Sequence, residues 1–310
     1  MSAQERFAQG FVGLGGVALV MIALVCAATG AVSPVADSSD YFASALTWLP
    51  QPAVNLVVAV TGAVTAATAI AAARGARATG LLRGASVLGL LALLGSGALA
   101  AAGYLPFLLV SAAAGHPELL RTYASAALPV QLLVAALITV SLWSWIERVA
   151  RGEQVRASSA GVWWTWVAVA VPLTYAASRV LMAIGVPGVP MERSSAAGGL
   201  GLAAAAVGGA VLTWGLIRPW GERFPRWAAR WAGRPVPVAL AVVPALVASV
   251  VVLAGSRLLV SVVILDHPAI PDHPLVWLPI ALWPLWSVAL VLAALHYRLR
   301  RAPAEVVGVR

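Results

Sequence analysis

The chain has 310 residues, of which 61% are hydrophobic and only 10% are charged, and its mean hydropathy is +0.92. Soluble domains carry roughly a quarter of charged residues, so the composition excludes an ordinary soluble globule. The net charge of +9 comes from 20 basic residues, all of them arginine. In so apolar a chain we assign this charge to loop topology and expect no nucleic-acid partner.

Eight apolar runs follow one another along the chain, each near or above the roughly 20 residues that a helix needs to cross a bilayer core. They cover 9–32, 52–73, 85–113, 128–146, 162–186, 197–217, 238–265 and 276–297. The runs lack the alternating pattern of a membrane β-barrel. We therefore predict an all-α transmembrane bundle of eight helices in a single domain, 1–310. Each of the halves 1–157 and 158–310 holds four runs, which indicates a weak internal division.

Arginine is distributed unevenly over the segments between these runs. With the amino terminus inside, sixteen arginines fall in inner segments and two, Arg121 and Arg193, in outer loops. Cytoplasmic loops carry the excess of basic residues, so we predict that both termini are cytoplasmic and that the protein is a multi-pass protein of the cell (plasma) membrane. The outer loops are then 33–51, 114–127, 187–196 and 266–275.

The two remaining arginines, Arg179 and Arg257, fall inside the fifth and seventh runs. A charge at membrane depth is costly and marks a candidate functional site. Each lies about 10–12 Å from the outer end of its helix at 1.5 Å per residue, so its side chain could also extend toward the interface. A structural role and a role in binding or transporting an anion are the two alternatives.

One outer loop repeats Asp-His-Pro, and its side chains suit a divalent metal ion. The weak candidate ligands are Asp266, His267, Asp272 and His273. Their spacing fits no recognised metal motif, so we predict neither a metal site nor a cofactor. The sequence also lacks the motifs of known nucleophiles, phosphate loops and dinucleotide sites. It therefore identifies no catalytic residues and favours a protein without enzymatic activity.

The inner loop between the sixth and seventh runs, 218–236, is the longest inner segment and is rich in arginine and tryptophan. Its stretch FPRWAARWAG predicts a short amphipathic helix on the membrane surface, beginning near Pro225 and ending at Gly233. Such a helix aligns its arginines on one face, with the tryptophans beside them. We expect these residues to contact anionic lipid at the cytoplasmic face or a protein partner of unknown identity: Arg226, Trp227, Arg230, Trp231 and Arg234.

The runs RPWGERFPRW…AGRPVPVALAVVPA (218–245) and PLTYAASRVLMAIGVP (172–187) resemble a functionally uncharacterised group of multi-pass membrane proteins from high-GC actinobacteria. That group shares an R-W-G-E-x-F-P-R-W loop, in which this chain has an additional proline between Arg218 and Trp220. The resemblance covers about the third quarter of the chain and implies membrane location and shared architecture, but no activity. Arg179, Glu222, Arg226 and Trp227 fall on the shared pattern.

Three functional hypotheses follow. A transporter or channel for a small solute predicts a polar cavity at mid-membrane with Arg179 and Arg257 facing it. A non-enzymatic membrane scaffold or partner-binding protein predicts a closed bundle whose distinctive surface is the 218–236 loop. An integral membrane enzyme ranks third among the hypotheses, because the sequence contains no evident set of catalytic residues.

Overall fold

The computed structural model describes residues 3–43, 45–76, 79–102, 115, 125–152, 159–185, 193–260 and 274–301. The described secondary structure is helical, apart from one isolated β-bridge between Arg223 and Pro235. The chain divides into two compact units, Met1–Ser144 and Trp145–Arg310. The helix α6 (Ala127–Arg151) contains the boundary between them.

Five described helices are long and apolar enough to cross a membrane by length and composition. They are Glu5–Thr29, Gln51–Ala73, Ala127–Arg151, Ser159–Ala183 and Val238–Arg257. Two shorter apolar helices, Thr79–Leu93 and Gly199–Gly215, accompany them. Many large apolar side chains of these helices are exposed, among them Leu14, Leu56 and Leu212. Such surfaces are expected of helices that face lipid.

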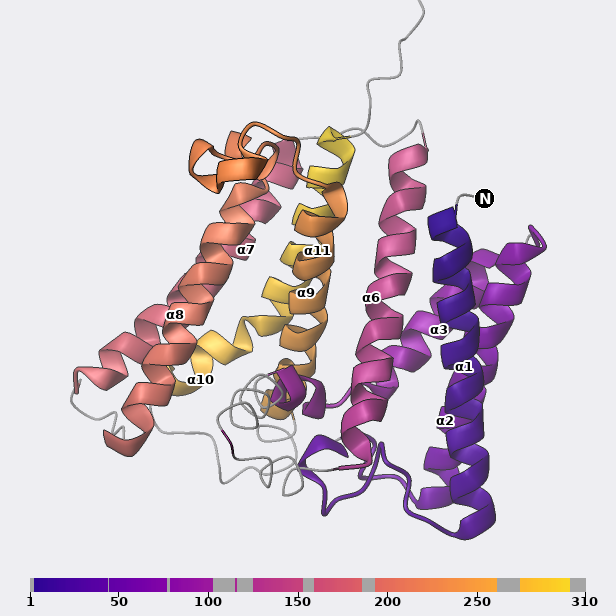
Figure 1. Ribbon diagram of the computed structural model, residues 1–310. Helices are drawn as coiled ribbons and strands as arrows, with labels where there is room; N and C mark the ends of the chain where they lie inside the picture. The colour runs from indigo at the N-terminus through magenta and orange to yellow at the C-terminus, as the bar shows by residue number, and fades with distance from the viewer. Residues whose placement is uncertain are drawn as a thin grey trace, which may run out of the picture. The chain divides into compact units, whose positions relative to one another are not determined.

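In the first unit, α1 (Ala3–Thr29) and α2 (Gln51–Ala73) lie side by side (Figure 1). Glycine permits their close approach, because a Cβ on Gly16 would lie 2.6 Å from the carbonyl oxygen of Gly62 and 2.5 Å from the amide nitrogen of Ala66. Small residues bring membrane helices together in this way. Gly16 therefore permits close packing of α1 against α2.

The next helix, α3 (Thr79–Leu93), packs against α2, and the hydroxyls of Thr65 and Ser86 are 2.8 Å apart between them. The predicted continuous run 85–113 is wrong in its first part, because the helix is interrupted at 94–96 before it resumes at 97–102. The fully buried Gln131 of α6 fills the break. Its Oε1 accepts a hydrogen bond from the Gly95 amide at 2.9 Å, and its Nε2 donates to the Leu93 carbonyl at 3.3 Å.

In the second unit, α11 (Trp283–Arg300) packs against both α7 (Ser159–Ala183) and α9 (Val238–Val260), and α8 (Arg193–Gly215) packs against α7. Ala168, Ala289 and Leu290 form a buried core between α7 and α11. The Ser249 hydroxyl of α9 donates to the Ser287 carbonyl of α11 at 2.9 Å. The positions of α8 and α9 are therefore set by their contacts with α7 and α11, respectively.

The last predicted run, 276–297, is also interrupted. It is divided into α10 (Pro274–Ala281) and α11, with Leu282 between them. Pro284 occupies the first turn of α11, where its missing N–H costs no helical hydrogen bond. Proline thus begins the second helix at a position where the sequence pattern alone suggested one continuous span.

Candidate functional site

The loop 218–236 joins α8 to α9 and is closed by backbone hydrogen bonds at its base (Figure 1). The Phe224 amide donates to the Arg234 carbonyl at 3.0 Å, and the Gly233 amide donates to the Phe224 carbonyl at 2.8 Å. The Val236 amide donates to the Glu222 carbonyl at 2.9 Å. The two ends of the loop are therefore paired as in a short antiparallel ladder.

The amphipathic helix predicted for the tip of this loop is not formed. Residues Arg226–Trp231 form a 3₁₀ segment, η3, that is broken at Ala228 and Ala229. Ala229 has φ 44° and ψ −112°, a conformation incompatible with a continuing helix. The paired base forces the chain to reverse within a few residues, and an isolated helix this short has little stability of its own. Consequently Arg226, Arg230 and Arg234 do not share one helical face.

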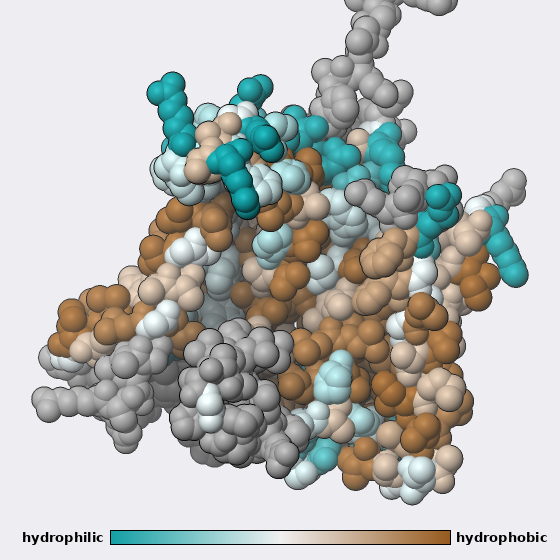
Figure 2. Space-filling model, viewed as in Figure 1, coloured by the Kyte–Doolittle hydropathy of each residue, from teal (hydrophilic) through white to brown (hydrophobic). Residues whose placement is uncertain are grey.

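The arginine and tryptophan side chains of the tip are nevertheless exposed. Trp227 has 84% of its surface exposed and Trp231 has 45%. The Trp231 and Phe224 rings pack in a tilted arrangement with centroids 5.5 Å apart, and the Arg230 guanidinium lies 5.6 Å from the Trp231 ring centroid. In Figure 2 the hydrophilic surface gathers over this loop, whereas the sides of the neighbouring helices are hydrophobic. The loop presents cations and aromatic rings together, as residues at a membrane interface do.

The carboxyl-terminal end of α11 holds the loop in place through three side chains, which we call the α11 latch: Tyr297, Arg300 and Arg301. The Tyr297 hydroxyl donates to the Gly221 carbonyl at 2.8 Å. Arg301 donates to the carbonyls of Glu222 and Val236 at 2.9 and 3.0 Å. Arg300 forms an ion pair with the Glu222 carboxylate at 3.0 Å and donates to the Leu216 carbonyl. The latch therefore contacts both ends of the loop.

A close backbone contact sets the start of the loop. A Cβ on Gly221 would lie only 1.9 Å from the Gly215 carbonyl oxygen, and a Cβ on Gly215 would meet the Trp220 ring at 2.5 Å. Gly221 therefore has no room for a side chain, whereas a side chain at position 215 would have to displace the Trp220 ring. This contact turns the chain sharply after α8 and places Trp220 against the end of that helix.

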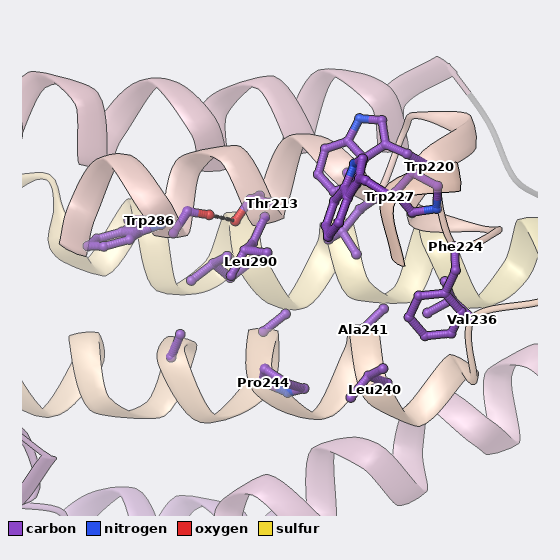
Figure 3. A pocket seen from close by; sticks show the side chains of 18 residues that line it. Thr213, Trp220, Phe224, Trp227, Val236, Leu240, Ala241, Pro244, Trp286 and Leu290 are labelled. Atoms are coloured by element: carbon purple, nitrogen blue, oxygen red, sulfur yellow. Dashed lines mark hydrogen bonds between the residues drawn. The ribbon is translucent and has the colours of Figure 1, made fainter. Parts of the chain in front are cut away.

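Beneath the loop, α8 and α9 leave a groove with a volume of about 340 Å³. The Trp220, Phe224 and Trp227 side chains gather at its loop end, and Trp286 of α11 lies toward the other end (Figure 3). Pro244 of α9 and Leu290 of α11 contribute to the walls. Gly209 of α8 helps to leave this space, because it lines the groove and a Cβ there would meet no described atom within 4 Å.

The intramembrane arginines lie elsewhere, on α7 and α9. Arg179 is half-buried, with its guanidinium carbon 4.8 Å from the Tyr175 ring centroid and its Nη1 3.6 Å from Sδ of Met182. Its Nε is buried and has no hydrogen-bond partner among the described residues. Arg257 is half-buried in the last turn of α9 and interacts with another part of the protein. The candidates Asp266, His267, Asp272 and His273 lie outside the described residues.

Sequence reasoning did not identify the α11 latch or the groove. Tyr297 and the two arginines were counted only as residues at the inner end of the last run, and no local motif links them to a loop about 80 positions earlier. Glu222 was noted through the actinobacterial resemblance. Its carboxylate and carbonyl both contact the latch, which gives this pattern position a structural role.

Comparison with known protein families, curated proteins and solved structures finds no match to this chain. Its class follows from the helices themselves. The chain is an integral membrane protein with multiple transmembrane helices, and its apolar spans contact the lipid bilayer.

Proposed function

We propose that this protein crosses the plasma membrane eight times, with both termini cytoplasmic, and acts as a non-enzymatic membrane scaffold. In this proposal the 218–236 loop lies at the cytoplasmic face and engages anionic lipid through its arginines. Support for this orientation comes from inner segments that meet at one end of the second unit. Glu147 near the end of α6 accepts a bidentate ion pair from Arg298, and Arg300 and Arg301 hold the loop.

The observation that carries the proposal is that some arginines of this region bind groups within the protein, whereas others are exposed. Those of α11 are used within the protein, because Arg300 and Arg301 bind loop carbonyls and Glu222. Those of the loop tip, Arg226, Arg230 and Arg234, are exposed. A closed loop that points its cations outward beside exposed indoles matches the chemistry of an anionic lipid surface, where each basic residue contributes about 1 kcal/mol.

The resemblance to the actinobacterial group supports the same proposal. The shared loop pattern includes Glu222, Arg226 and Trp227, which are respectively a latch contact, an exposed cation and an exposed indole. We infer that the pattern describes one folded surface loop that the group has in common.

Fluorescence quenching tests the proposal. A single cysteine introduced by Ala232→Cys in a Cys26→Ala background carries an environment-sensitive dye, and the protein is reconstituted with lipids brominated on their acyl chains. We expect quenching to increase with the fraction of phosphatidylglycerol in vesicles of phosphatidylcholine. Changing Arg226, Arg230 and Arg234 together to glutamine should remove most of this dependence, because three charges at about 1 kcal/mol each are lost.

The matched control changes Arg74, Arg148 and Arg151 to glutamine, which removes the same number of inner charges outside the loop. Equal loss of quenching in both triple variants would refute a specific role for the loop. Unchanged quenching in the loop variant, with loss of a defined protein complex isolated from mild detergent, would instead establish a partner-binding loop. Labelling of Ala232→Cys from outside intact cells by a membrane-impermeant reagent would overturn the orientation.

Arg179 supports a second candidate function, passage of a small anion. Its Nε is buried without a hydrogen-bond partner among the described residues, and buried polar groups usually have one. Arg179→Lys should retain anion flux into proteoliposomes in part, whereas Arg179→Gln should abolish it. Equal flux in vesicles with and without the protein would exclude this function.

A further inference from the structure

The groove beneath the loop is shaped for one extended chain. Along α8 its lining runs from Gly209 to Gly215, about 9 Å at 1.5 Å per residue. The lining of α9, from Leu240 to Ala248, covers a similar length. Each leaflet has about 15 Å of hydrocarbon. A chain entering at the loop end would thus occupy the groove over most of the depth of one leaflet.

The apolar lining of the groove favours a hydrocarbon chain over a polar ligand. The lining is apolar except for a few groups, and the Thr213 hydroxyl among them already donates to the Gly209 carbonyl at 2.8 Å (Figure 3). Trp286 contributes mainly an aromatic ring, and its Nε1 has no hydrogen-bond partner among the described residues. A polar solute would lose its hydration in this groove and gain few hydrogen bonds in return.

The charge at the mouth selects an anion. Phe224 and Pro225 line the groove, and the exposed Arg223 and Arg226 flank them in sequence. The acidic residue of the loop, Glu222, is paired with Arg300. Arg223 and Arg226 form no ion pair among the described residues, and as sequence neighbours of two lining residues they put positive charge near the loop end of an apolar groove. This combination complements a phosphate group attached to a hydrocarbon chain.

We infer that the second unit has a discrete site for one anionic phospholipid. One acyl chain lies between α8 and α9, and the phosphate headgroup lies against Arg223 and Arg226. The inference rests on the proposed function, that the loop engages anionic lipid, and adds that a single lipid is held in a preformed groove. The Gly215–Gly221 contact and the α11 latch fix the end of the groove independently of any ligand.

Two adjacent glycines allow a matched test. Gly208 and Gly209 both face open space, but only Gly209 lines the groove. Gly209→Leu should fill the groove, whereas Gly208→Leu adds the same side chain to the same helix outside it. The full-length protein in mild detergent, freed of lipid, is titrated with phosphatidylglycerol or phosphatidylcholine of the same chains, and native mass spectrometry counts the bound lipids.

For the wild-type protein we expect one saturable phosphatidylglycerol that binds at least about tenfold more tightly than phosphatidylcholine, as two arginines at the surface predict. Gly209→Leu should weaken this binding about tenfold or more, and Gly208→Leu should leave it unchanged. Arg223→Gln combined with Arg226→Gln should remove the preference for phosphatidylglycerol but retain binding of both lipids. Thermal unfolding of each variant confirms that it is folded, and Ala245→Phe, from the opposite wall, replaces Gly209→Leu if that variant unfolds.

Equal binding by Gly209→Leu and Gly208→Leu would overturn the groove site. If the arginine variant still lost its lipid preference, the proposed function of the loop would stand without a discrete site. If neither the groove nor the arginine variants changed lipid binding, both the inference and the proposed function would fail.

Discussion

The two units use glycine in opposite ways. In the first, Gly16 of α1 lies against the backbone of Gly62 and Ala66, so that a Cβ would clash at 2.5 Å. In the second, Gly208 and Gly209 of α8 face open space within the described part of the chain. Both sets occur in apolar runs of similar composition, yet Gly16 allows contact between helices, whereas Gly209 leaves room for a groove.

Polar groups differ between the units in the same sense. The interrupted third helix of the first unit is sealed by Gln131, which bonds to both sides of the break. In the second unit the polar side chains of the α11 latch hold a loop above a groove that stays open. A break in a membrane helix therefore does not by itself indicate a binding site, because its freed backbone groups can be satisfied internally.

The largest expected effect comes from filling the tight contact. Gly16→Leu should lower the free energy of unfolding by about 3 kcal/mol or more, because the backbone of α2 must move away. Gly208→Leu, the same change in open space, should alter it by less than about 0.5 kcal/mol. Reversible unfolding in mixed detergent measures both. Similar values for the two variants would remove the contrast between the units.

The second-largest effect is expected at Gln131, which bonds to both sides of the helix break. Gln131→Leu should cost about 2–4 kcal/mol of unfolding free energy, because the Gly95 amide and the Leu93 carbonyl lose their buried partner. Thr139→Val on the same helix is the control, since among the described residues the Thr139 hydroxyl bonds only to the Ala135 carbonyl of its own helix. We expect a loss below about 1 kcal/mol there. An equal loss in both variants would show that Gln131 has no special role.

Opening the latch should have a local effect. Arg301→Gln removes two hydrogen bonds from a charged donor to the loop, and we expect trypsin to cut after Arg223, Arg226 or Arg230 at least about tenfold faster. Arg298→Gln removes the same charge three residues earlier, and the Arg298 side chain pairs with Glu147 instead of the loop. It should leave the rate of loop cleavage near that of the wild type. Faster cleavage in both variants would mean that α11 as a whole, and not the latch, protects the loop.

The smallest effect tests the strained turn. Ala229→Gly should stabilise the closed loop by about 1 kcal/mol, because glycine adopts φ 44° without a steric penalty. Trypsin cleavage of the loop should then slow about fivefold. Ala228→Gly, at φ −75°, offers no such relief and should leave cleavage equal or faster. Slower cleavage in the second variant alone would contradict the assigned turn.

The sequence alone determined the class of the protein. A run of about 20 apolar residues is a local property, and in a membrane it has to be helical because its backbone has no water to bond. Composition therefore predicted the all-α membrane protein, and the exposed aromatic and cationic character of the 218–236 loop followed from local residue types in the same way.

Only the tertiary structure decided the shape of the loop, the breaks in two helices and the groove. The predicted helix at FPRWAARWAG fails because hydrogen bonds between Phe224 and Arg234 reverse the chain, and periodicity carries no information on that pairing. The latch joins Gly221 to Tyr297, 76 positions apart. Whether a glycine such as Gly16 or Gly209 is filled by a neighbour or left open depends on which helix lies opposite, and that is set by packing across the unit and not by the residues beside it.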